Sequence, residues 1–411
     1  MKVPVSWLRE YVSFDTPLDE LAATLVFTSF EVDRIVRRGV PDLDGNLGLF
    51  RVGKVLEAVK HPNADRLQLC QVDVGDREPR QIVCGAWNFG AGATVAVALP
   101  GARLPGAEDP LREARLRGET SSGMILSERE LELGADHSGI IVLEDGPEPG
   151  TPLANVLPLA EDVLEIETGF NRPDLPAIYG IAREVAVVTG AELSPPPGAD
   201  PEPADDEPVD VRVDDFGGCP RYVGRLFRGA TIAPSPFWMK ARLVAAGMRP
   251  ISNVVDVTNY VMLALGSPLH AFDVTRLREQ RIVVRRAAAG EEITTLDGQQ
   301  RRLTGDDLVI ADASRPVAIA GVMGGEDSEV RAETTNLLLE AANFDPLTVL
   351  GTSRRLRLRT ESSTRWEKGV DPHLAPIAAT YATQLLVELA GARWVGATDV
   401  HAELPERPVM R

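Results

Sequence analysis

The chain has 411 residues, which is too long for one hydrophobic core and predicts about two to four domains. Its 44% hydrophobic and 25% charged residues are ordinary for a folded soluble protein, and no run approaches the ~18 apolar residues of a membrane helix. The net charge of −18 argues against a protein that binds nucleic acid over its whole surface. We expect a cytoplasmic protein with no membrane partner.

Cysteine and histidine spacing predicts no metal site. Cys70, Cys84 and Cys219 form no C-x-x-C pair, and the five histidines are scattered along the chain. Small buried thiols are the simpler interpretation of the cysteines. We therefore predict that this chain binds no metal and no other cofactor.

The first 150 residues change character at residue 39. Residues 1–38 predict a small mixed unit, with a helix near Leu18–Phe27 and a strand at Glu31–Val36. Residues 39–150 alternate short strands with Gly/Pro turns, which is typical of a small β-barrel. The predicted strands are Val52–Ala58, Leu67–Val74, Gln81–Cys84 and Thr94–Ala98.

Residues 151–193 return to an α/β pattern. The tetrad Asn171-Arg172-Pro173-Asp174 predicts a turn, because proline forces the preceding residue to be extended. The helix that follows should end at Gly190, a C-terminal cap. Residues 194–208 are Pro-rich and acidic with nothing to bury, and predict a linker.

Residues 209–400 predict an α+β domain. Ser235 and Pro236 resemble the N-cap and first residue of one helix, and the apolar spacing of Val254, Val257, Val261 and Leu265 predicts a second. Asp297-Gly298 predicts a hairpin turn. Further strands are expected at 281–287, 307–313, 316–321 and 336–344, with a helix at 374–390.

Four segments of the predicted barrel carry a resemblance to a known module. Residues 61–75, 81–88, 97–105 and 116–131, in that order, resemble the tRNA-binding OB fold appended to several tRNA synthetases. OB folds hold nucleic acid through grooves and stacking faces. Residues 40–150 contain 11 Lys+Arg against 18 Asp+Glu, a net charge of −7, and few aromatic side chains, such as Trp87 and Phe89. Direct tRNA binding and a spacer role therefore both stay open.

The rest of the chain resembles one family. Residues 1–12 with 164–186 are similar to the split N-terminal domain of the phenylalanyl-tRNA synthetase beta subunit, and residues 249–273, 318–326, 336–344 and 357–372 are similar to its editing domain. The resemblance implies a multidomain α+β protein in which an OB-fold β-barrel is inserted and an α+β editing domain follows. The implied parts are a split domain (1–38 and 151–193), the OB fold (39–150), a linker (194–208), the editing domain (209–400) and the start of a next module (401–411).

Glu340 and His270 are the leading site candidates. Glu340 lies in a strand between Leu339 and Ala341, so it either faces water on the outer side or is buried with a donor. Residue 270 follows the helix stop Gly266-Ser267-Pro268, which places the histidine on a rigid loop. The resemblance favours a pocket for Glu340, and it makes His270 an editing-site residue that places the hydrolytic water or the terminal adenosine.

The same resemblance implies further site residues. Asn259 and Thr360 join His270 and Glu340 as catalytic candidates, whereas Gly321, Gly324 and Ser362 line the substrate pocket. Ser362 stands where the family usually has alanine, and its hydroxyl narrows the pocket and adds a donor. A run of arginines holds the phosphates of the tRNA acceptor end or forms a solvated strand face: Arg354, Arg355, Arg357 and Arg359.

The function implied by the resemblance is proofreading within phenylalanine–tRNA ligase. In that family the beta subunit binds tRNA(Phe) and hydrolyses tyrosine wrongly attached to it, whereas the alpha subunit aminoacylates with ATP and Mg²⁺ in an alpha2-beta2 tetramer. Two alternatives to this function stay open at this point: a stand-alone trans-editing hydrolase and a non-enzymatic tRNA-binding scaffold.

Overall fold

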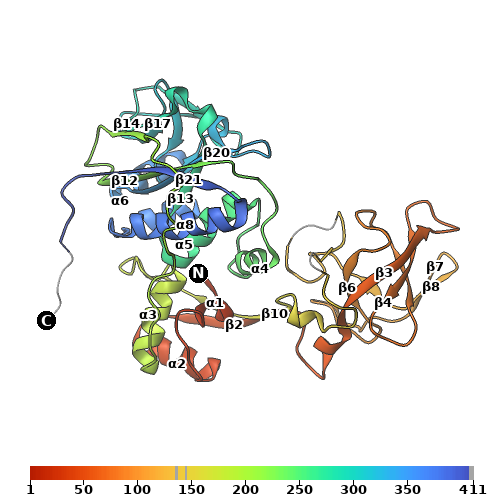
Figure 1. Cartoon of the computed structure of the whole chain (residues 1–411). Helices are drawn as coiled ribbons and strands as arrows, with labels where there is room; N and C mark the ends of the chain where they lie inside the picture. The colour runs from red at the N-terminus through yellow and green to blue at the C-terminus, as the bar shows by residue number, and fades with distance from the viewer. Residues whose placement is uncertain (135–137, 144–145, 407–411) are drawn as a thin grey trace.

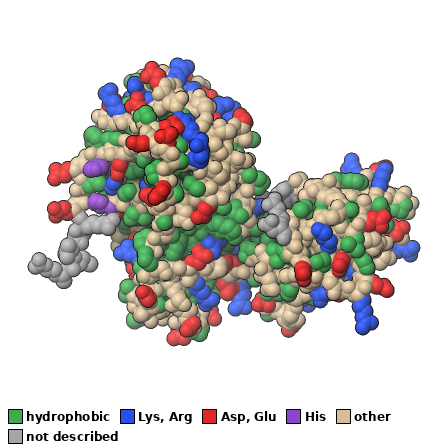
Figure 2. Space-filling model, viewed as in Figure 1, with side chains coloured by type: hydrophobic (Ala, Val, Ile, Leu, Met, Phe, Trp, Pro, Cys, Tyr) green, Lys and Arg blue, Asp and Glu red, His purple; other side chains and the backbone are tan. Residues whose placement is uncertain are grey.

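The computed structural model describes residues 1–134, 138–143 and 146–406. The chain forms a sheet-rich mixed α+β structure in which a β-rich body stands beside a larger α/β body (Figure 1). Acidic and basic side chains are interspersed over the visible face of both bodies (Figure 2). Within the described residues, no helix combines the length and apolarity needed to cross a membrane.

A three-stranded antiparallel sheet joins the two ends of the split N-terminal segment. Strand β10 (Ala160–Ile166) lies in the middle, between β1 (Lys2–Pro4) and β2 (Val32–Gly39). Its helices are α1 (Val5–Leu8), α2 (Leu18–Thr28) and α3 (Ile178–Thr189), and they share one apolar cluster with the sheet. As predicted, Gly190 ends α3 in the left-handed conformation, with φ of 72°.

The turn at Asn171–Asp174 is held by ion pairs. Arg172 bonds Asp174 through Nε (2.9 Å) and Nη2 (2.8 Å), and Nη2 also reaches Glu184 on α3 (2.7 Å). These pairs account for the tetrad as a structural turn that fixes the start of α3.

The β-rich body is built on a five-stranded antiparallel sheet, here called the barrel unit (residues 50–152). Its strand order is β5–β4–β3–β6–β9, and Ser122 N, just before β9, donates to Gln81 O of β5 (2.8 Å), so the sheet is nearly closed. All four strands predicted in this region are present. The bounds are β3 (Phe50–Lys60), β4 (Gln68–Asp73), β5 (Arg80–Cys84), β6 (Thr94–Ala98) and β9 (Met124–Ile125), with a hairpin β7 (Ala114–Leu116) and β8 (Glu119–Ser121), and short 3-10 helices at η1 (Asn46–Leu49) and η2 (Leu153–Asn155).

The larger body has two stacked sheets and a helical layer. The first sheet is antiparallel, β13–β20–β12–β21, and one of its faces packs on α5 (Asn253–Leu265) and α8 (Leu374–Ala390). Its other face packs on the second sheet, β11–β14–β17–β18–β19, around a shared apolar core. The first-sheet bounds are β13 (Leu269–Asp273), β20 (Asn336–Asn343), β12 (Arg221–Arg228) and β21 (Arg393–His401). The second-sheet bounds are β11 (Asp210–Val213), β14 (Arg281–Arg286), β17 (Leu308–Ala311), β18 (Pro316–Ile319) and β19 (Met323–Gly324).

Shorter elements complete this body. A hairpin of β15 (Glu292–Thr294) and β16 (Gln300–Arg302) turns at the predicted Asp297-Gly298. The remaining helices are α4 (Phe237–Ala245), α6 (Pro346–Leu356) and α7 (Glu361–Trp366), with 3-10 turns at η3 (Val274–Arg276), η4 (Arg278–Gln280) and η5 (Glu326–Ser328). Helix α4 reaches the barrel unit, where Lys240 and Glu128 form a largely buried ion pair.

Three local predictions were wrong. Ser235 does not cap α4, because its hydroxyl bonds Asp256 (2.5 Å) and Pro236 occupies the cap position. His270 lies in strand β13 and not in a loop, since the helix stop at Gly266 leads directly into the sheet. The arginine run is no strand, because Arg354 and Arg355 end helix α6 and Arg357 is its left-handed cap.

Residues 194–208 form no helix or strand, but they contact the larger body along their length. Asp200 pairs with the buried Arg225, and the Ala204 and Glu207 amides donate to Trp394 O (2.7 Å) and Val395 O (2.6 Å). The segment therefore binds along β21, although its sequence predicted a tether with nothing to bury. Of the predicted next module at 401–411, residues 407–411 lie outside the described residues.

Candidate functional site

A cavity of about 230 Å³ lies between the two sheets of the larger body, beside helices α5 and α7. Its volume is below the ~300–1,000 Å³ of pockets that enclose whole small molecules, so it has room for one side chain. The lining includes every site residue predicted from the sequence apart from the arginines: Asn259, His270, Gly321, Gly324, Glu340, Thr360 and Ser362.

Glu340 is buried in the middle of the first sheet. It lies on β20 directly opposite Gly224 of β12 and His270 of β13, on the face that packs against the second sheet. Its side chain is 5% exposed, so the alternative of a solvent-facing carboxylate is wrong. Burial raises the pKa of Glu340 to about 8, and the neighbouring Tyr222 hydroxyl opposes that rise.

His270 is the cross-strand neighbour of that carboxyl. Its imidazole packs edge-on against Phe272, with ring centroids 4.5 Å apart. Burial lowers the pKa of His270 to about 4, so the ring is neutral at physiological pH. A neutral imidazole donates a hydrogen bond at one ring nitrogen and accepts one at the other. It carries no charge with which to attract a phosphate.

Three polar atoms around this cavity are fully buried and lack a hydrogen-bond partner among the described residues. They are Nε2 of His270, Oε2 of Glu340 and the hydroxyl of Tyr222. Tyr222 lies close enough to Glu340 to influence its charge, but the pair does not meet hydrogen-bond geometry. Buried polar atoms in native proteins are nearly always paired, so this cluster indicates a site that a polar ligand or water completes.

Gly324 gives the His270 ring its space. A Cβ at this position would lie 2.6 Å from Cε1 and 2.8 Å from Nε2 of the imidazole. Gly321 is constrained in two ways, because its φ is 69° and a Cβ would meet Val349 at 2.8 Å and Trp366 at 2.9 Å. Both glycines are thus required by close packing at the cavity wall.

Thr360 and Ser362 tie the start of α7 to that wall. The Thr360 hydroxyl accepts from Ser363 N (3.0 Å) as the helix cap and donates to Val322 O (2.9 Å). The Ser362 hydroxyl donates to Gly321 O (3.1 Å). Each hydroxyl proton is already used, so these side chains shape the cavity and offer it only lone pairs.

Asn259 reaches the cavity from α5. Its amide makes no hydrogen bond within the described part of the chain, whereas Asn253 on the same helix bonds Thr231 O (2.9 Å) and Leu389 O (3.0 Å). Asn253 is therefore a buried amide that joins backbone segments of the core, whereas Asn259 is left free to contact a ligand.

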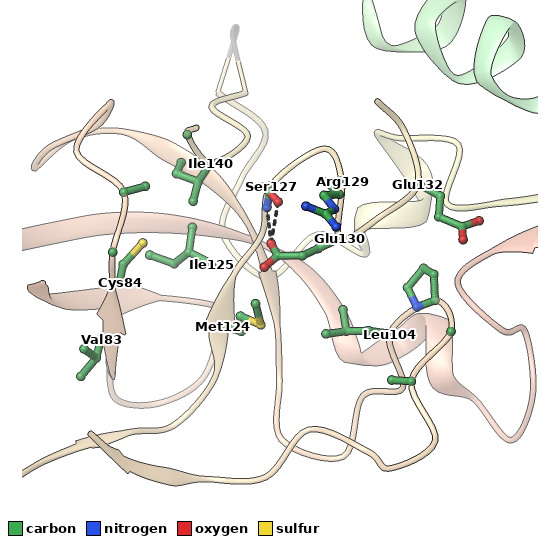
Figure 3. A pocket seen from close by; sticks show the side chains of 16 residues that line it. Val83, Cys84, Leu104, Met124, Ile125, Ser127, Arg129, Glu130, Glu132 and Ile140 are labelled. Atoms are coloured by element: carbon green, nitrogen blue, oxygen red, sulfur yellow. Dashed lines mark hydrogen bonds between the residues drawn. The ribbon is translucent and has the colours of Figure 1, made fainter. Parts of the chain in front are cut away.

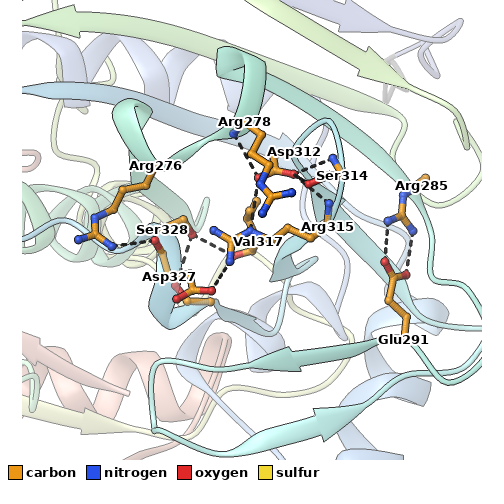
Figure 4. Close-up of polar contacts among 11 residues, drawn as sticks. Arg276, Arg278, Arg285, Glu291, Asp312, Ser314, Arg315, Val317, Asp327 and Ser328 are labelled. Carbon is orange, nitrogen blue, oxygen red and sulfur yellow. Dashed lines mark hydrogen bonds and ion pairs between the residues drawn. The ribbon is translucent and has the colours of Figure 1, made fainter.

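A polar cluster fixes the segments that follow β17 and β19 (Figure 4). Asp312 accepts from the backbone amides of Ser314 (2.8 Å) and Arg315 (2.9 Å), and Arg315 pairs with Asp327. Ser328 donates to Val317 O (3.1 Å), which ties η5 back to β18. The backbone around Gly324 and Gly325 is thereby held against the cavity.

The arginine run divides into two pairs. Arg355 pairs with the buried Asp307, and Arg359 bonds the buried Glu367 (2.6 Å), so both compensate buried charges. Arg354 and Arg357 are exposed and make no ion pair within the described residues. Only these two are free to bind a phosphate.

A second cavity, of about 700 Å³, lies in the barrel unit, between the edge strands β5 and β9 (Figure 3). Cys84, Met124, Ile125 and Ile140 supply apolar side chains, and Glu130 accepts from both the amide and the hydroxyl of Ser127 (2.6 and 2.8 Å). The sequence did not single out this cavity. The described residues contain no group of three or more His, Cys, Asp or Glu side chains placed to hold a metal ion.

Comparison with known proteins agrees with the two bodies seen here. Residues 218–391 match the family described as the B3/4 domain, and residues 50–152 match the one described as a putative tRNA binding domain. The phenylalanine–tRNA ligase beta subunit of Moorella thermoacetica is 49% identical over 403 residues, which are 96% of this chain and 49% of that protein. The chain belongs to the phenylalanine–tRNA ligase beta-subunit family.

A second family member, from Geobacter metallireducens, is 46% identical over 413 residues, covering 100% of this chain and 51% of its own length. The chain thus spans about half the length of the curated relatives it matches. Among solved structures, an N-terminal fragment of the phenylalanyl-tRNA synthetase beta subunit from Pyrococcus horikoshii aligns with 54% of this chain and 64% of its own, at 15% identity and a TM-score of 0.28.

Three residues of this site were not predicted from the sequence: Tyr222 and the aromatic wall residues Phe344 and Trp366. Phe344 and Trp366 pack edge to face, with centroids 5.3 Å apart, and both line the cavity. The signal that could have found Tyr222 is the alternation in Arg221–Arg228, where Tyr222, Gly224 and Leu226 face the same core.

Proposed function

We propose that this chain supplies the proofreading site of a phenylalanine–tRNA ligase and hydrolyses tyrosine wrongly esterified to tRNA(Phe). The observation that supports it best is a buried carboxyl, Glu340, that lines a cavity with room for one side chain and is not fully hydrogen-bonded within the described residues. Such a carboxyl favours a ring that carries a hydroxyl over one that does not. In a pocket that binds the apolar ring of phenylalanine, this carboxyl would make no favourable interaction.

Discrimination by this cavity complements that of a synthetic site. A pocket built for phenylalanine rejects the same ring with one extra hydroxyl by only about 10²-fold. Here the phenol of tyrosine bonds Glu340, whereas phenylalanine leaves the buried carboxyl unpaired at a cost of about 1–3 kcal/mol. The preference is therefore reversed, and tyrosine is the ring removed.

Hydrolysis of the aminoacyl ester then needs a positioned water and a stabilised oxyanion. The lining offers no Ser-His-Asp or Cys-His arrangement, since its serine and threonine hydroxyls are bonded to backbone. We assign His270 and Asn259 to the placement of the water and the ester, and Gly324 to the close approach of backbone. Thr360 and Ser362 hold the wall.

We assign the barrel unit to tRNA binding as an OB fold, inserted in the split unit 1–38 and 151–193. Arg354 and Arg357 are the phosphate contacts we retain, because Arg355 and Arg359 are paired with buried carboxylates. In the complete enzyme, an alpha subunit performs aminoacylation with ATP and Mg²⁺ in an alpha2-beta2 tetramer in the cytoplasm. The B3/4 and tRNA-binding matches favour this over a scaffold without activity.

The test is the deacylation of Tyr-tRNA(Phe) by the complete native enzyme and by its Glu340→Ala and Glu340→Gln variants. We expect the wild type to release tyrosine and both variants to lose at least tenfold, the equivalent of ~1.4 kcal/mol. Equal rates in all three would refute phenol recognition by Glu340. Activity of the purified chain without any partner would favour the trans-editing alternative.

A further inference from the structure

Tyr222 is a wholly buried tyrosine whose hydroxyl has no hydrogen-bond partner in the described structure. It lies on β12 two residues from Gly224, which is directly opposite Glu340. Gly224 has no side chain, and Tyr222 is the residue of that strand that interacts with the Glu340 carboxyl. Burial raises the pKa of Tyr222 well above 10, and the hydroxyl therefore stays a permanent donor.

Few titratable groups face this carboxyl from the elements around it. From β13 comes the neutral His270, and before β12 comes Cys219, a buried thiol bonded to Arg221 O (3.4 Å). The second sheet contributes the apolar side chains of Ile310, Ala318 and Ile319. At the cavity rim, the exposed Glu361 is paired with Arg365. Thus no cation contacts Glu340 within the described residues, and the side chain that interacts with its carboxyl is Tyr222.

We propose that the Tyr222 hydroxyl donates to Oε2 of Glu340 in the working enzyme, which leaves Oε1 to accept a hydrogen bond from the phenol hydroxyl of the substrate tyrosine. This inference rests on the proposed function, and it makes Tyr222 a positioning residue that acts through Glu340. The donor favours the ionised carboxylate and fixes its plane. Only a carboxylate oriented in this way presents a lone pair to the cavity at a constant position.

A phenylalanine at position 222 would fill nearly the same volume without burying a hydroxyl. Burying an unpaired hydroxyl is unfavourable, so the present residue is explained if a partner completes it in the functional state. Glu340 is the partner within reach, because each of the two groups shifts the pKa of the other.

The test compares Tyr222→Phe, Glu340→Gln and the double variant in the complete native enzyme. The kcat/KM for Tyr-tRNA(Phe) deacylation is measured between pH 6 and 9, with uncatalysed hydrolysis subtracted. Loss of the donor raises the pKa of Glu340. The part of the profile in which kcat/KM rises with pH should therefore shift to higher pH by about one unit in Tyr222→Phe. The variant is then about tenfold slower than wild type at pH 7 and only about twofold slower at pH 9.

Two controls separate the possible failures. Tyr11→Phe removes the hydroxyl of another buried tyrosine, in the N-terminal core, and should leave the profile unchanged. In the Glu340→Gln background, Tyr222→Phe should have no further effect, because its partner is gone. An unmoved profile for Tyr222→Phe, or an equal loss in both backgrounds, overturns the role of Tyr222. A wild-type enzyme that does not deacylate Tyr-tRNA(Phe), or that ignores Glu340→Gln, overturns the proposed function instead.

Discussion

The buried carboxyl of Glu340 should make the protein less stable as the pH rises. Its pKa is about 8 when folded and 4.5 ordinarily, so between these pH values the unfolded chain has lost a proton that the folded chain retains. Stability falls with pH wherever the folded state binds more protons. The contribution is complete below pH 4.5 and is lost as the pH rises through about 8. The difference between these two pKa values corresponds to at most about 5 kcal/mol of unfolding free energy.

Glu340→Gln removes this dependence, because glutamine does not titrate. The unfolding free energy of the variant relative to wild type should therefore increase by about 4 kcal/mol from pH 5 to pH 8.5. Other carboxyl groups, such as Asp307, titrate equally in both proteins and cancel in the difference. Urea unfolding followed by circular dichroism at the two pH values measures it.

Glu333→Gln is a matched control on an exposed glutamate just before β20. It reports the effect of the same substitution on an exposed side chain at both pH values. If the pH dependence of the Glu340→Gln difference is no larger than that of this control, the carboxyl is not held neutral by burial. The account of the cavity as a desolvated site then fails.

Three further predictions follow from the cavity wall and the arginines. Gly324→Ala places a Cβ 2.6 Å from the His270 ring, so Tyr-tRNA(Phe) deacylation should fall at least tenfold (~1.4 kcal/mol) while the circular dichroism spectrum stays the same; an unaffected rate would contradict the placement of His270. Thr360→Ala removes a helix cap and a bond to Val322 O and should lower the unfolding free energy by about 1–2 kcal/mol in urea titrations, whereas no loss would mean that the cap is dispensable. Arg357→Glu should raise KM for tRNA without changing stability, whereas Arg355→Ala should lower the unfolding free energy by about 1–3 kcal/mol because Asp307 loses its ion pair. The reverse pattern would contradict the division of the four arginines into free and ion-paired side chains.

The elements that the sequence predicted well are those with strong local signals. Periodic apolar residues located α5 and α8, and Asp297-Gly298 located the β15–β16 hairpin. Strands β12, β13 and β21 were missed because their pairing partners lie far along the chain, as His270 with Glu340 does. A strand of that kind is defined by its neighbours, and its own residues do not show them.

The site shows the same division between local and long-range information. Apolar neighbours marked Glu340 as unusual, but they were equally consistent with simple alternation, and only the sheet-on-sheet packing decides that its face is buried. The arginines looked alike in sequence, but two of them pair with buried carboxylates elsewhere in the chain. Arg355 pairs with Asp307, 48 residues earlier, and Arg359 pairs with Glu367, 8 residues later.

The polar atoms of the cavity and its apolar packing serve one purpose when taken together. His270, Glu340 and Tyr222 each hold a polar atom that the folded chain does not satisfy, within a core that is otherwise well packed. A core selected for stability alone would replace them with apolar side chains, since unpaired buried polar groups are unfavourable. Their retention in one place is explained if Tyr222 pairs with Glu340 in the functional state and a hydroxylated ring completes the carboxylate, because the free energy lost in the empty site is then regained only with that substrate.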